Sequence, residues 1–369
     1  MIGPAHGHNI KSFFDFFNIN QNYELTFAYD GEDEYSSLYE NIKFVKFSPN
    51  PALLLQFIKL IREPHNLIWY HGGYSIGVLF LENLFHLKKT IVTINIWGPV
   101  MLQWAVQKNS KGFLYRYFLN KADIVQCGWY GTKRQMDKFN PESKSVVLPS
   151  GIEKSFFLES GDSISTFTKD FINQIPTDKT VFFYPKSIIP QTCHKEIVEA
   201  AKELLEKGVK NFLIYFWLGN LHNRTEIDLI KNMITKYSLE DQIEIVFHDF
   251  LPFVDIKAIW SRVDVGFLLV DDDQLSTALL EPLVMGKEII ASNIYAYRAL
   301  RDKYSELELQ LIENVPAAIA QRMEDFIDGN RTLEYILEKR KKVIEKEFNF
   351  EKNLQKMLDY YQQLTKDRA

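Results

Sequence analysis

The sequence predicts an α/β protein built from two doubly wound parallel-sheet domains. Short apolar runs of strand length alternate with longer stretches of helical period along most of the chain. This alternation lapses once, over a mixed and polar stretch at 153–178, and then restarts. The chain has 369 residues, which is long for a single hydrophobic core, so two domains of ordinary size are expected.

The first half of the chain predicts the N-terminal domain. Its apolar runs are "NLIWYHGG" (66–73), "TIVTINIWG" (90–98), "ADIVQCGW" (122–129) and "SVVLPSG" (145–151), with helix-period stretches such as 51–62 and 74–87 between them. Continuous apolar runs are typical of parallel strands that are buried on both faces. The opening "MIGP" is too short for a complete first strand, so either that strand is abbreviated or residues precede Met1.

The second half predicts a second parallel sheet. The strands are expected at 180–187, 211–220, 243–250, 264–270 and 287–292, and the helices at 193–207, 223–238, 254–262 and 274–285. The domain boundaries that follow are 1–155 for the N-terminal domain, 156–178 for a linker and 179–347 for the C-terminal domain. Ligands of such sheets bind beyond the carboxyl ends of the strands, which predicts a site in a cleft between the domains.

Composition excludes several classes of protein. The net charge of −5 argues against a general nucleic-acid binder. Cys127 and Cys193 form no CxxC pair, which favours a reducing compartment and structural thiols. No apolar run reaches the roughly 18 residues of a membrane-spanning helix, and no signal peptide is evident. We therefore expect a cytoplasmic protein, either free or peripheral on the inner face of the plasma membrane.

The most informative stretch is "DVGFLLVDDDQLSTALLEPLVMGKEIIAS" (264–292). Its three aspartates could form a metal site, a sugar site or a solvated loop. Free N–H groups at a helix start near Ser276 and Thr277 would favour an anion, and Glu281, further along the helix, could accept hydrogen bonds from ribose hydroxyls. An ordinary βαβ unit with a surface glutamate explains the same pattern equally well.

This stretch resembles the signature of retaining glycosyltransferases of the GT-B fold, in which two glutamates separated by seven residues precede a glycine and an apolar strand. Glu281 matches the second glutamate, Asp273 stands at the first, and Gly286 and "IIAS" follow in register. The stretches "LPSGIEKSFF" and "ADIVQCGWYGTKRQM" also resemble the group. So does "EFNFEKNLQKMLDYYQQL", which matches its C-terminal helix, so 348–369 should return to the N-terminal domain.

The resemblance implies two Rossmann-like domains that face a central cleft. It also implies transfer of a sugar, with retention, from a UDP-, GDP- or dTDP-sugar to a saccharide or lipid-linked acceptor, typically in bacterial surface polysaccharide synthesis. The implied donor residues are Glu281 on the ribose, Ser276, Thr277, Lys186 and Lys195 on the diphosphate, and Asp273 on the sugar. The implied acceptor and reaction-centre residues are Gly7, His8, His71, Asn95 and Trp97.

The sequence departs from the family pattern at the diphosphate site and at the reacting centre. Lys186 replaces an arginine, Gln191 replaces a lysine for which His194 or Lys195 could compensate, and Asn95 replaces a histidine. A catalytically degenerate subunit that binds sugar nucleotide or a partner transferase therefore stays open. So do a metal-dependent GT-A-type transferase that uses Asp271–Asp273 and a sugar-nucleotide epimerase.

No cofactor or metal requirement is expected, because the "HGH" at 6–8 has no third ligand at a useful spacing. Between His86 and Ser145 basic residues far outnumber acidic ones, and aromatic residues are interleaved with them. This pattern predicts a face that lies on an anionic membrane surface and meets a lipid-linked acceptor. A solvated surface over a core explains it equally well. No nucleic-acid partner is expected, since no reading motif accompanies the charge.

Overall fold

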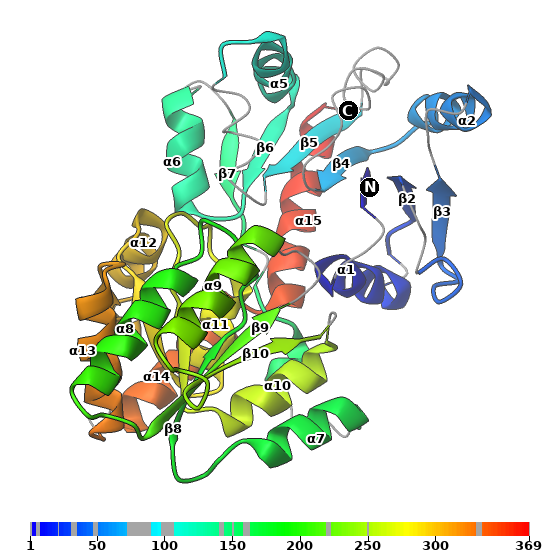
Figure 1. Ribbon diagram of the computed structural model, residues 1–369. Coiled ribbons are helices and arrows are strands. Elements are labelled where there is room, and N and C mark those ends of the chain that lie inside the picture. Colours follow the sequence, from blue (N-terminus) through cyan, green and yellow to red (C-terminus); the bar gives the residue numbers. More distant parts are fainter. Residues whose placement is uncertain are drawn as a thin grey trace. The chain divides into compact units, whose positions relative to one another are not determined.

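The computed structural model describes residues 2–4, 8–20, 22–30, 35–46, 51–71, 90–96, 107–139, 144–149, 151–157, 163–218, 223–248, 251–329 and 334–368. The chain divides into two compact units (Figure 1). Unit 1 comprises Met1–Ser150 together with Glu351–Ala369, and unit 2 comprises Gly151–Phe350. The predicted helix at 74–87 lies outside the described residues.

Unit 1 is built on a parallel sheet. Its described strands are β1 (Ile2–Pro4), β2 (Leu25–Asp30), β3 (Ile42–Lys46), β4 (Leu67–His71), β5 (Ile91–Ile96), β6 (Ile124–Cys127) and β7 (Ser145–Val147). They lie in the order β3-β2-β1-β4-β5-β6-β7, which is the Rossmann order with one further strand. Every residue of β5 is buried, as the continuous apolar run predicts for a central parallel strand.

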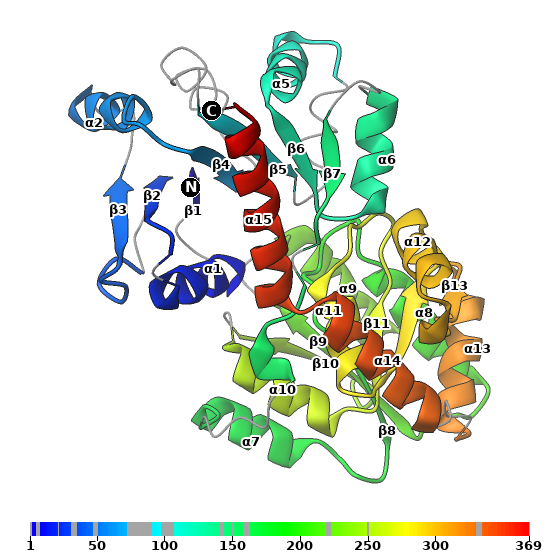
Figure 2. The ribbon, with the colours of Figure 1, turned by 180° about the vertical axis from the view of Figure 1, so that it is seen from behind.

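The described helices of unit 1 are α1 (His8–Ile19), α2 (Pro51–Ile61), α5 (Ser110–Lys121), α6 (Tyr130–Phe139) and α15 (Phe350–Arg368). Helix α15 is far from the sheet in sequence but lies beside β4 and β5 in both views (Figures 1 and 2). The buried hydroxyl of Tyr361 on α15 donates to Gln126 Oε1 at 2.7 Å and lies 3.2 Å from Thr93 Oγ1. The C-terminal segment therefore belongs to unit 1.

Unit 2 has a second parallel sheet of the Rossmann order. Its strands are β8 (Thr180–Tyr184), β9 (Phe212–Leu218), β10 (Ile243–Phe247), β11 (Val265–Leu268), β12 (Glu288–Ser292) and β13 (Leu311–Ile312), arranged β10-β9-β8-β11-β12-β13. The strand order reverses between β8 and β11, which are parallel neighbours. The predicted fold class, two Rossmann-like doubly wound halves, is thus confirmed.

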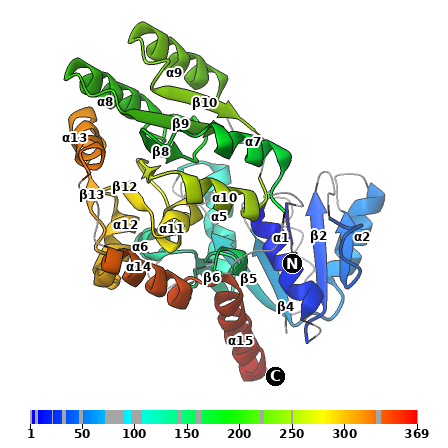
Figure 3. The same ribbon diagram turned by 90° about the horizontal axis from the view of Figure 1, so that it is seen from below.

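Helices cover both faces of this second sheet (Figure 3). They are α7 (Thr166–Gln174), α8 (His194–Glu206), α9 (Arg224–Lys236), α10 (Phe253–Arg262), α11 (Thr277–Val284), α12 (Tyr295–Lys303), α13 (Pro316–Ile327) and α14 (Glu334–Glu347). Short 3₁₀ turns lie at η1 (Lys154–Phe156) and η2 (Ser305–Leu307). Helix α8 packs against α9 and α13, and α10 packs against α7 and α11.

The segment 156–178, expected to be an irregular linker, contains helix α7. Ser165 caps this helix by accepting from the Thr168 N–H at 3.2 Å. Phe171 is buried and packs edge-on against Tyr215 and Trp217 of β9. The polar composition of the segment concealed this short amphipathic pattern, because only one face of α7 is apolar.

Two glycines occupy backbone positions that other residues would strain. Gly286 has φ +65° just after α11, which is the helix-ending position expected for it. Gly151 has φ +93°, and a Cβ there would lie 2.2 Å from the Phe348 carbonyl oxygen. This close approach lets Ile152 bond to both Phe348 and Phe350, at 2.7 and 2.8 Å.

Candidate active site

The carboxyl ends of β8 and β11 bring together two charged residues that the sequence assigned to the donor. Lys186 Nζ lies 3.1 Å from Asp273 Oδ2 and donates to Ser276 Oγ at 3.0 Å. The Lys186 and Asp273 side chains are 23% and 20% exposed, so the pair is accessible but not fully solvated. Because β8 and β11 meet where the strand order reverses, the pair stands where doubly wound sheets bind their ligands.

Asp273 is held by two further donors. The hydroxyl of Tyr297, on α12, donates to Asp273 Oδ2 at 2.9 Å, and the Gln274 N–H donates to Oδ1 at 2.8 Å. Burial, with the nearby Asp273 charge, raises the pKa of Tyr297 well above its usual value. The phenol therefore stays protonated and donates at neutral pH. Tyr297 was not predicted from the sequence. The one indication was that Tyr297 follows β12, the strand beside β11, at the same edge of the sheet.

The loop that carries the three aspartates is fastened to neighbouring strand ends. The Val270 N–H donates to Ser292 Oγ at 2.7 Å, Asn314 Nδ2 donates to the Val270 carbonyl at 3.0 Å, and the Asp271 N–H donates to the Gln191 carbonyl at 3.1 Å. Asp271 and Asp272 are exposed, whereas Asp273 is half-buried. Asp273 is therefore the aspartate that faces the Lys186 cluster.

A metal site was one of the three interpretations that the sequence left open for Asp271–Asp273. Within the described ranges, no group of three histidine, cysteine, aspartate or glutamate side chains is arranged to hold a metal ion.

Helix α11 begins three residues later than the sequence predicted, at Thr277. Ser276 is its extended N-cap residue (φ −70°, ψ 139°), but the Ser276 side chain makes no capping bond. Its Oγ accepts from Lys186 instead. The first N–H groups of a helix carry a partial positive charge. The start of α11 and the Lys186 ammonium thus form one electropositive corner beside Asp273.

Glu281 lies deeper than the sequence suggested. Its side chain is buried, and Oε2 accepts from Trp260 Nε1 on α10 at 3.0 Å. Burial raises the pKa of this carboxyl, while hydrogen bonds from Trp260 and Thr277 oppose the shift. Gly266 makes room for the indole, since a Cβ there would lie 2.9 Å from the Trp260 ring. Trp260 is a second residue of this site that sequence analysis missed.

The two basic residues expected to supplement Lys186, His194 and Lys195, differ in burial and in charge. Lys195 is exposed in the first turn of α8. His194 is buried between Tyr184 and Phe216, and burial lowers its pKa to about 3. The suggestion that His194 supplies positive charge is wrong, because the imidazole is neutral at physiological pH.

The residues assigned to the acceptor and the reacting centre belong to unit 1. Asn95 on β5 is paired with His71, the last residue of β4. Asn95 is 2% exposed, and its Nδ2 has no hydrogen-bond partner among the residues that the structure describes. His8 is the first residue of α1. Gly7 and Trp97 lie outside the described residues.

The predicted basic and aromatic face is only partly a surface. Tyr115, Phe118 and Trp129 are buried in the core of unit 1, so their place in the pattern reflects packing. Phe113 and Tyr117 of α5 are 61% and 39% exposed. Basic residues accompany them on or beside this helix, namely exposed Lys108 and Lys121 and half-buried Arg116.

Two Rossmann-like units in one chain, with charged residues at the switch point of the second, are the architecture of the GT-B fold. The sequence pattern described as "Glycosyl transferases group 1" matches residues 165–350, half of the chain. The chain therefore belongs to this family and is a glycosyltransferase. No curated protein matches it.

Solved structures of the same fold cover nearly all of the chain. HepE of Anabaena, in complex with UDP and glucose, is 11% identical, covers 97% of each chain and has a TM-score of 0.76. A glycosyltransferase of Rickettsia africae is 17% identical, covers 98% of this chain and 97% of its own, and has a TM-score of 0.77. WaaG, a glycosyltransferase involved in lipopolysaccharide biosynthesis, is 10% identical, covers 98% of this chain and 97% of its own, and has a TM-score of 0.65.

Proposed function

We propose that the protein transfers a sugar from a nucleotide-diphosphate donor to a saccharide or lipid-linked saccharide acceptor, with retention, in bacterial surface polysaccharide synthesis. The observation that carries the proposal is the cluster of Lys186, Asp273, Ser276 and Tyr297 at the switch point of unit 2. A cation, a hydroxyl, a carboxylate and a helix start are the groups that a diphosphate joined to a sugar requires.

Lys186 and the start of α11 would bind the diphosphate. The lysine ammonium has three N–H donors, of which two point to Asp273 and Ser276. The third can point to a phosphate oxygen, and the Thr277 N–H can take a second. Lysine offers a point charge instead of the fork of an arginine, so the phosphate is held without bidentate geometry. Glu281 would accept from the ribose, and exposed Lys195 would add long-range attraction.

Asp273 would accept hydrogen bonds from the donor sugar. Two of its donors, Lys186 and Tyr297, meet at Oδ2, which keeps the carboxylate in one orientation. We assign retention because the 264–292 signature resembles that of retaining enzymes. In such a reaction the leaving phosphate takes the acceptor proton on the same face of the sugar. Asn95 could then only position a hydroxyl, since an amide does not titrate, and His71, His8 and Trp97 would contact the acceptor.

The structures of similar fold support a nucleotide sugar and a surface polysaccharide. HepE was solved with UDP-glucose as well as with UDP, and WaaG acts in lipopolysaccharide synthesis. A thermal-shift screen with UDP-, GDP- and dTDP-sugars identifies the donor.

Transfer is then measured for Asp273→Asn beside Asp272→Asn, a matched control on the same loop. We expect Asp273→Asn to lose transfer by roughly 100-fold, as is typical for one positioned charged group. Asp272→Asn should remain near the parent protein, because Asp272 is exposed. Equal activity of the two variants would refute the Asp273 assignment. Loss of activity in EDTA with recovery in manganese would favour the metal-dependent alternative.

We also propose that α5 rests on the anionic inner face of the plasma membrane. Its exposed Phe113 and Tyr117 have Arg116 and Lys121 on the same helix. Apolar side chains flanked by cations suit the lipid interface. No helix among the described residues is both long and apolar enough to cross a bilayer.

Co-sedimentation with phosphatidylglycerol vesicles tests this contact. The double variant Phe113→Ser/Tyr117→Ser should reduce binding several-fold. A matched control is Tyr335→Ser, on α14 of unit 2, which is 56% exposed. If the parent protein and the double variant sediment equally, α5 is not the membrane contact.

A further inference from the structure

The loop between β8 and α8, which carries Lys186, is closed by one threonine side chain. Lys186 is the second residue after β8, and Thr192 is the second residue before α8. The Thr192 hydroxyl donates to the carbonyl oxygens of Ser187 and Ile189, which lie 2.9 and 2.8 Å away. Its oxygen also accepts from the Ile189 N–H at 3.2 Å. Three backbone groups of the loop therefore converge on one hydroxyl.

A buried imidazole contacts the same hydroxyl. His194 Nδ1 lies 3.0 Å from Thr192 Oγ1. Because the one hydroxyl hydrogen is shared between two carbonyl oxygens, the ring nitrogen has to be the donor in this contact. The imidazole is 1% exposed and packs between Tyr184 and Phe216, with ring centroids 4.5 and 4.8 Å away. The rings on both sides fix the imidazole, and the imidazole in turn fixes the direction of the Thr192 hydroxyl.

The same segment is bonded to the loop that carries Asp273. Thr192 and Val270 form an isolated antiparallel bridge, and the Asp271 N–H donates to the Gln191 carbonyl at 3.1 Å. Asp273 is two residues beyond Asp271. The two loops that supply the ion pair of the candidate active site are therefore joined beside Thr192.

The position of the Lys186 ammonium depends on this loop. The ammonium lies 3.1 Å from Asp273 Oδ2 and 3.0 Å from Ser276 Oγ, at the end of a flexible side chain. Groups that bind a ligand have to be held within about 0.5 Å of the productive geometry, which requires hydrogen bonds behind them. Loss of the Thr192 hydroxyl frees the Ser187 carbonyl, next to Lys186, and lets the lysine move away from the start of α11.

We propose that Thr192 is a positioning residue for the donor: through the loop that its hydroxyl closes, it holds the Lys186 ammonium where the diphosphate binds. The inference rests on the proposed function, because the diphosphate of a nucleotide sugar is taken as the ligand of Lys186. Thr192 acts on that ligand through the lysine, and His194 acts through Thr192. His194 thereby has a structural task as a neutral imidazole, in place of the positive charge expected from the sequence.

The test measures nucleotide binding by calorimetry with UDP, GDP and dTDP, for the full chain and for two variants at position 192. Thr192→Val keeps the shape of the side chain and removes the hydroxyl, whereas Thr192→Ser keeps the hydroxyl. We expect Thr192→Val to weaken binding roughly 10-fold, which corresponds to about 1.4 kcal/mol. Thr192→Ser should bind like the parent protein. In transfer assays the KM for the donor should rise with little change in kcat, because the diphosphate is held alike in the ground and transition states.

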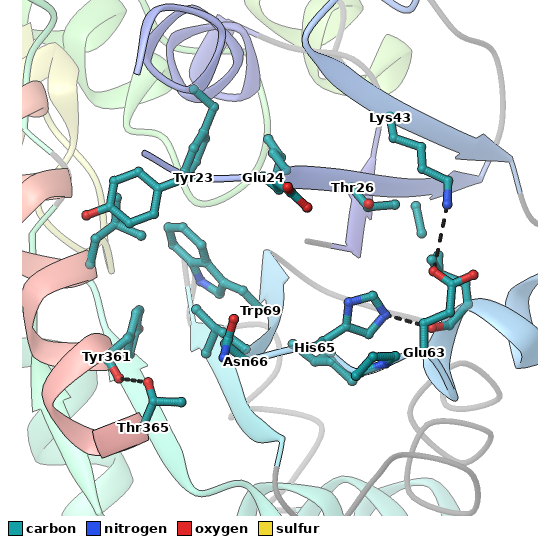
Figure 4. Close-up of a pocket in the computed structure, with 18 of the residues that line it drawn as sticks. Tyr23, Glu24, Thr26, Lys43, Glu63, His65, Asn66, Trp69, Tyr361 and Thr365 are labelled. Atoms are coloured by element: carbon teal, nitrogen blue, oxygen red, sulfur yellow. Dashed lines mark hydrogen bonds and ion pairs between the residues drawn. The ribbon is translucent and has the colours of Figure 1, made fainter. Parts of the chain in front are cut away.

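Two controls separate positioning from a general loss of stability. Thr26→Val makes the same change in unit 1, where half-buried Thr26 of β2 lines a pocket (Figure 4), and it should leave nucleotide binding unchanged. Lys186→Met removes the ammonium through which Thr192 acts. We therefore expect Thr192→Val to cause no further loss of binding in the Lys186→Met background, since residues that act as one unit are not additive.

The outcomes distinguish this inference from the proposed function. If Thr192→Val binds nucleotide as tightly as the parent protein, or loses the same factor with and without Lys186, then Thr192 does not position the lysine and the inference is wrong. If the parent protein binds none of the three nucleotides, the proposed function fails and the inference fails with it.

Discussion

Replacing Glu281 by glutamine separates the stability of unit 2 from donor binding. The carboxylate is buried, accepts from Trp260 and interacts with Thr277. A glutamine of the same shape keeps an oxygen for the indole N–H and directs its amide to the threonine hydroxyl. The change therefore removes a buried charge while both contacts of the carboxylate, with Trp260 and with Thr277, keep a partner.

The raised pKa of Glu281 determines the direction in which the substitution changes stability at each pH. Burial raises the native pKa of Glu281 above the value of 4.5 that it has outside the fold. Ionisation then costs the native state stability, and this cost develops as pH rises from 4.5 and is complete above the native pKa. We expect Glu281→Gln to raise Tm at pH 8, by about 2–4 °C for each kcal/mol in a domain of this size, and to raise it less at pH 5.

The same substitution, Glu281→Gln, should weaken donor binding although it raises Tm. A hydrogen bond to a charged group contributes about 1.5–3 kcal/mol and a neutral one about 1 kcal/mol. Loss of about 1–2 kcal/mol weakens binding roughly 5- to 30-fold. Calorimetry with the donor identified by the screen measures the affinity, and thermal denaturation at both pH values measures the stability. A lower Tm at pH 8 would refute the burial argument, and unchanged affinity would refute the ribose assignment.

Two further predictions concern buried polar contacts. Tyr297→Phe keeps the ring and removes the donor to Asp273. Transfer should fall roughly 10-fold or more, the equivalent of about 1.5–3 kcal/mol, and an unaltered rate would show that this contact does not position the carboxylate. Arg340→Met removes the partner of Glu288, 3.3 Å away in the interior. Breaking a buried pair costs about 3–5 kcal/mol, so Tm should drop by about 6–20 °C. Arg340 also donates to the Leu307 and Glu308 carbonyls, so the double variant Arg340→Met/Glu288→Met should recover only part of that loss. A double variant no more stable than the single one would contradict the ion-pair argument.

The strands could be predicted because apolar runs are local patterns, and the resemblance to a family placed Asp273 and Lys186 together. The apolar run 211–220 became β9, and "DVGFLLV" became β11. Asp273 and Lys186, 87 residues apart, were placed in one site by their match to a family signature, and they lie 3.1 Å apart. Helix α7 was missed, because its apolar face is short and its other residues are polar.

Several features follow only from long-range packing. His194 and Lys195 are adjacent in sequence, yet the first is buried between aromatic rings and the second is exposed. Trp260 reaches Glu281 from another helix, and Tyr297 reaches Asp273 from the helix after the next strand. No local pattern records such contacts, since they depend on which elements the sheet order makes neighbours.

The sequence by itself determined the alternation of strand and helix, the division into two sheets, and the residues at the carboxyl ends of β8 and β11. Hydrophobic periodicity and turn chemistry are local, so they can be read along the chain. Only the tertiary structure decided how deeply Glu281 is buried, and that Trp260 and Tyr297 hold the Glu281 and Asp273 carboxylates. Burial and electrostatics depend on neighbours brought together from distant segments, which is why these properties required the fold.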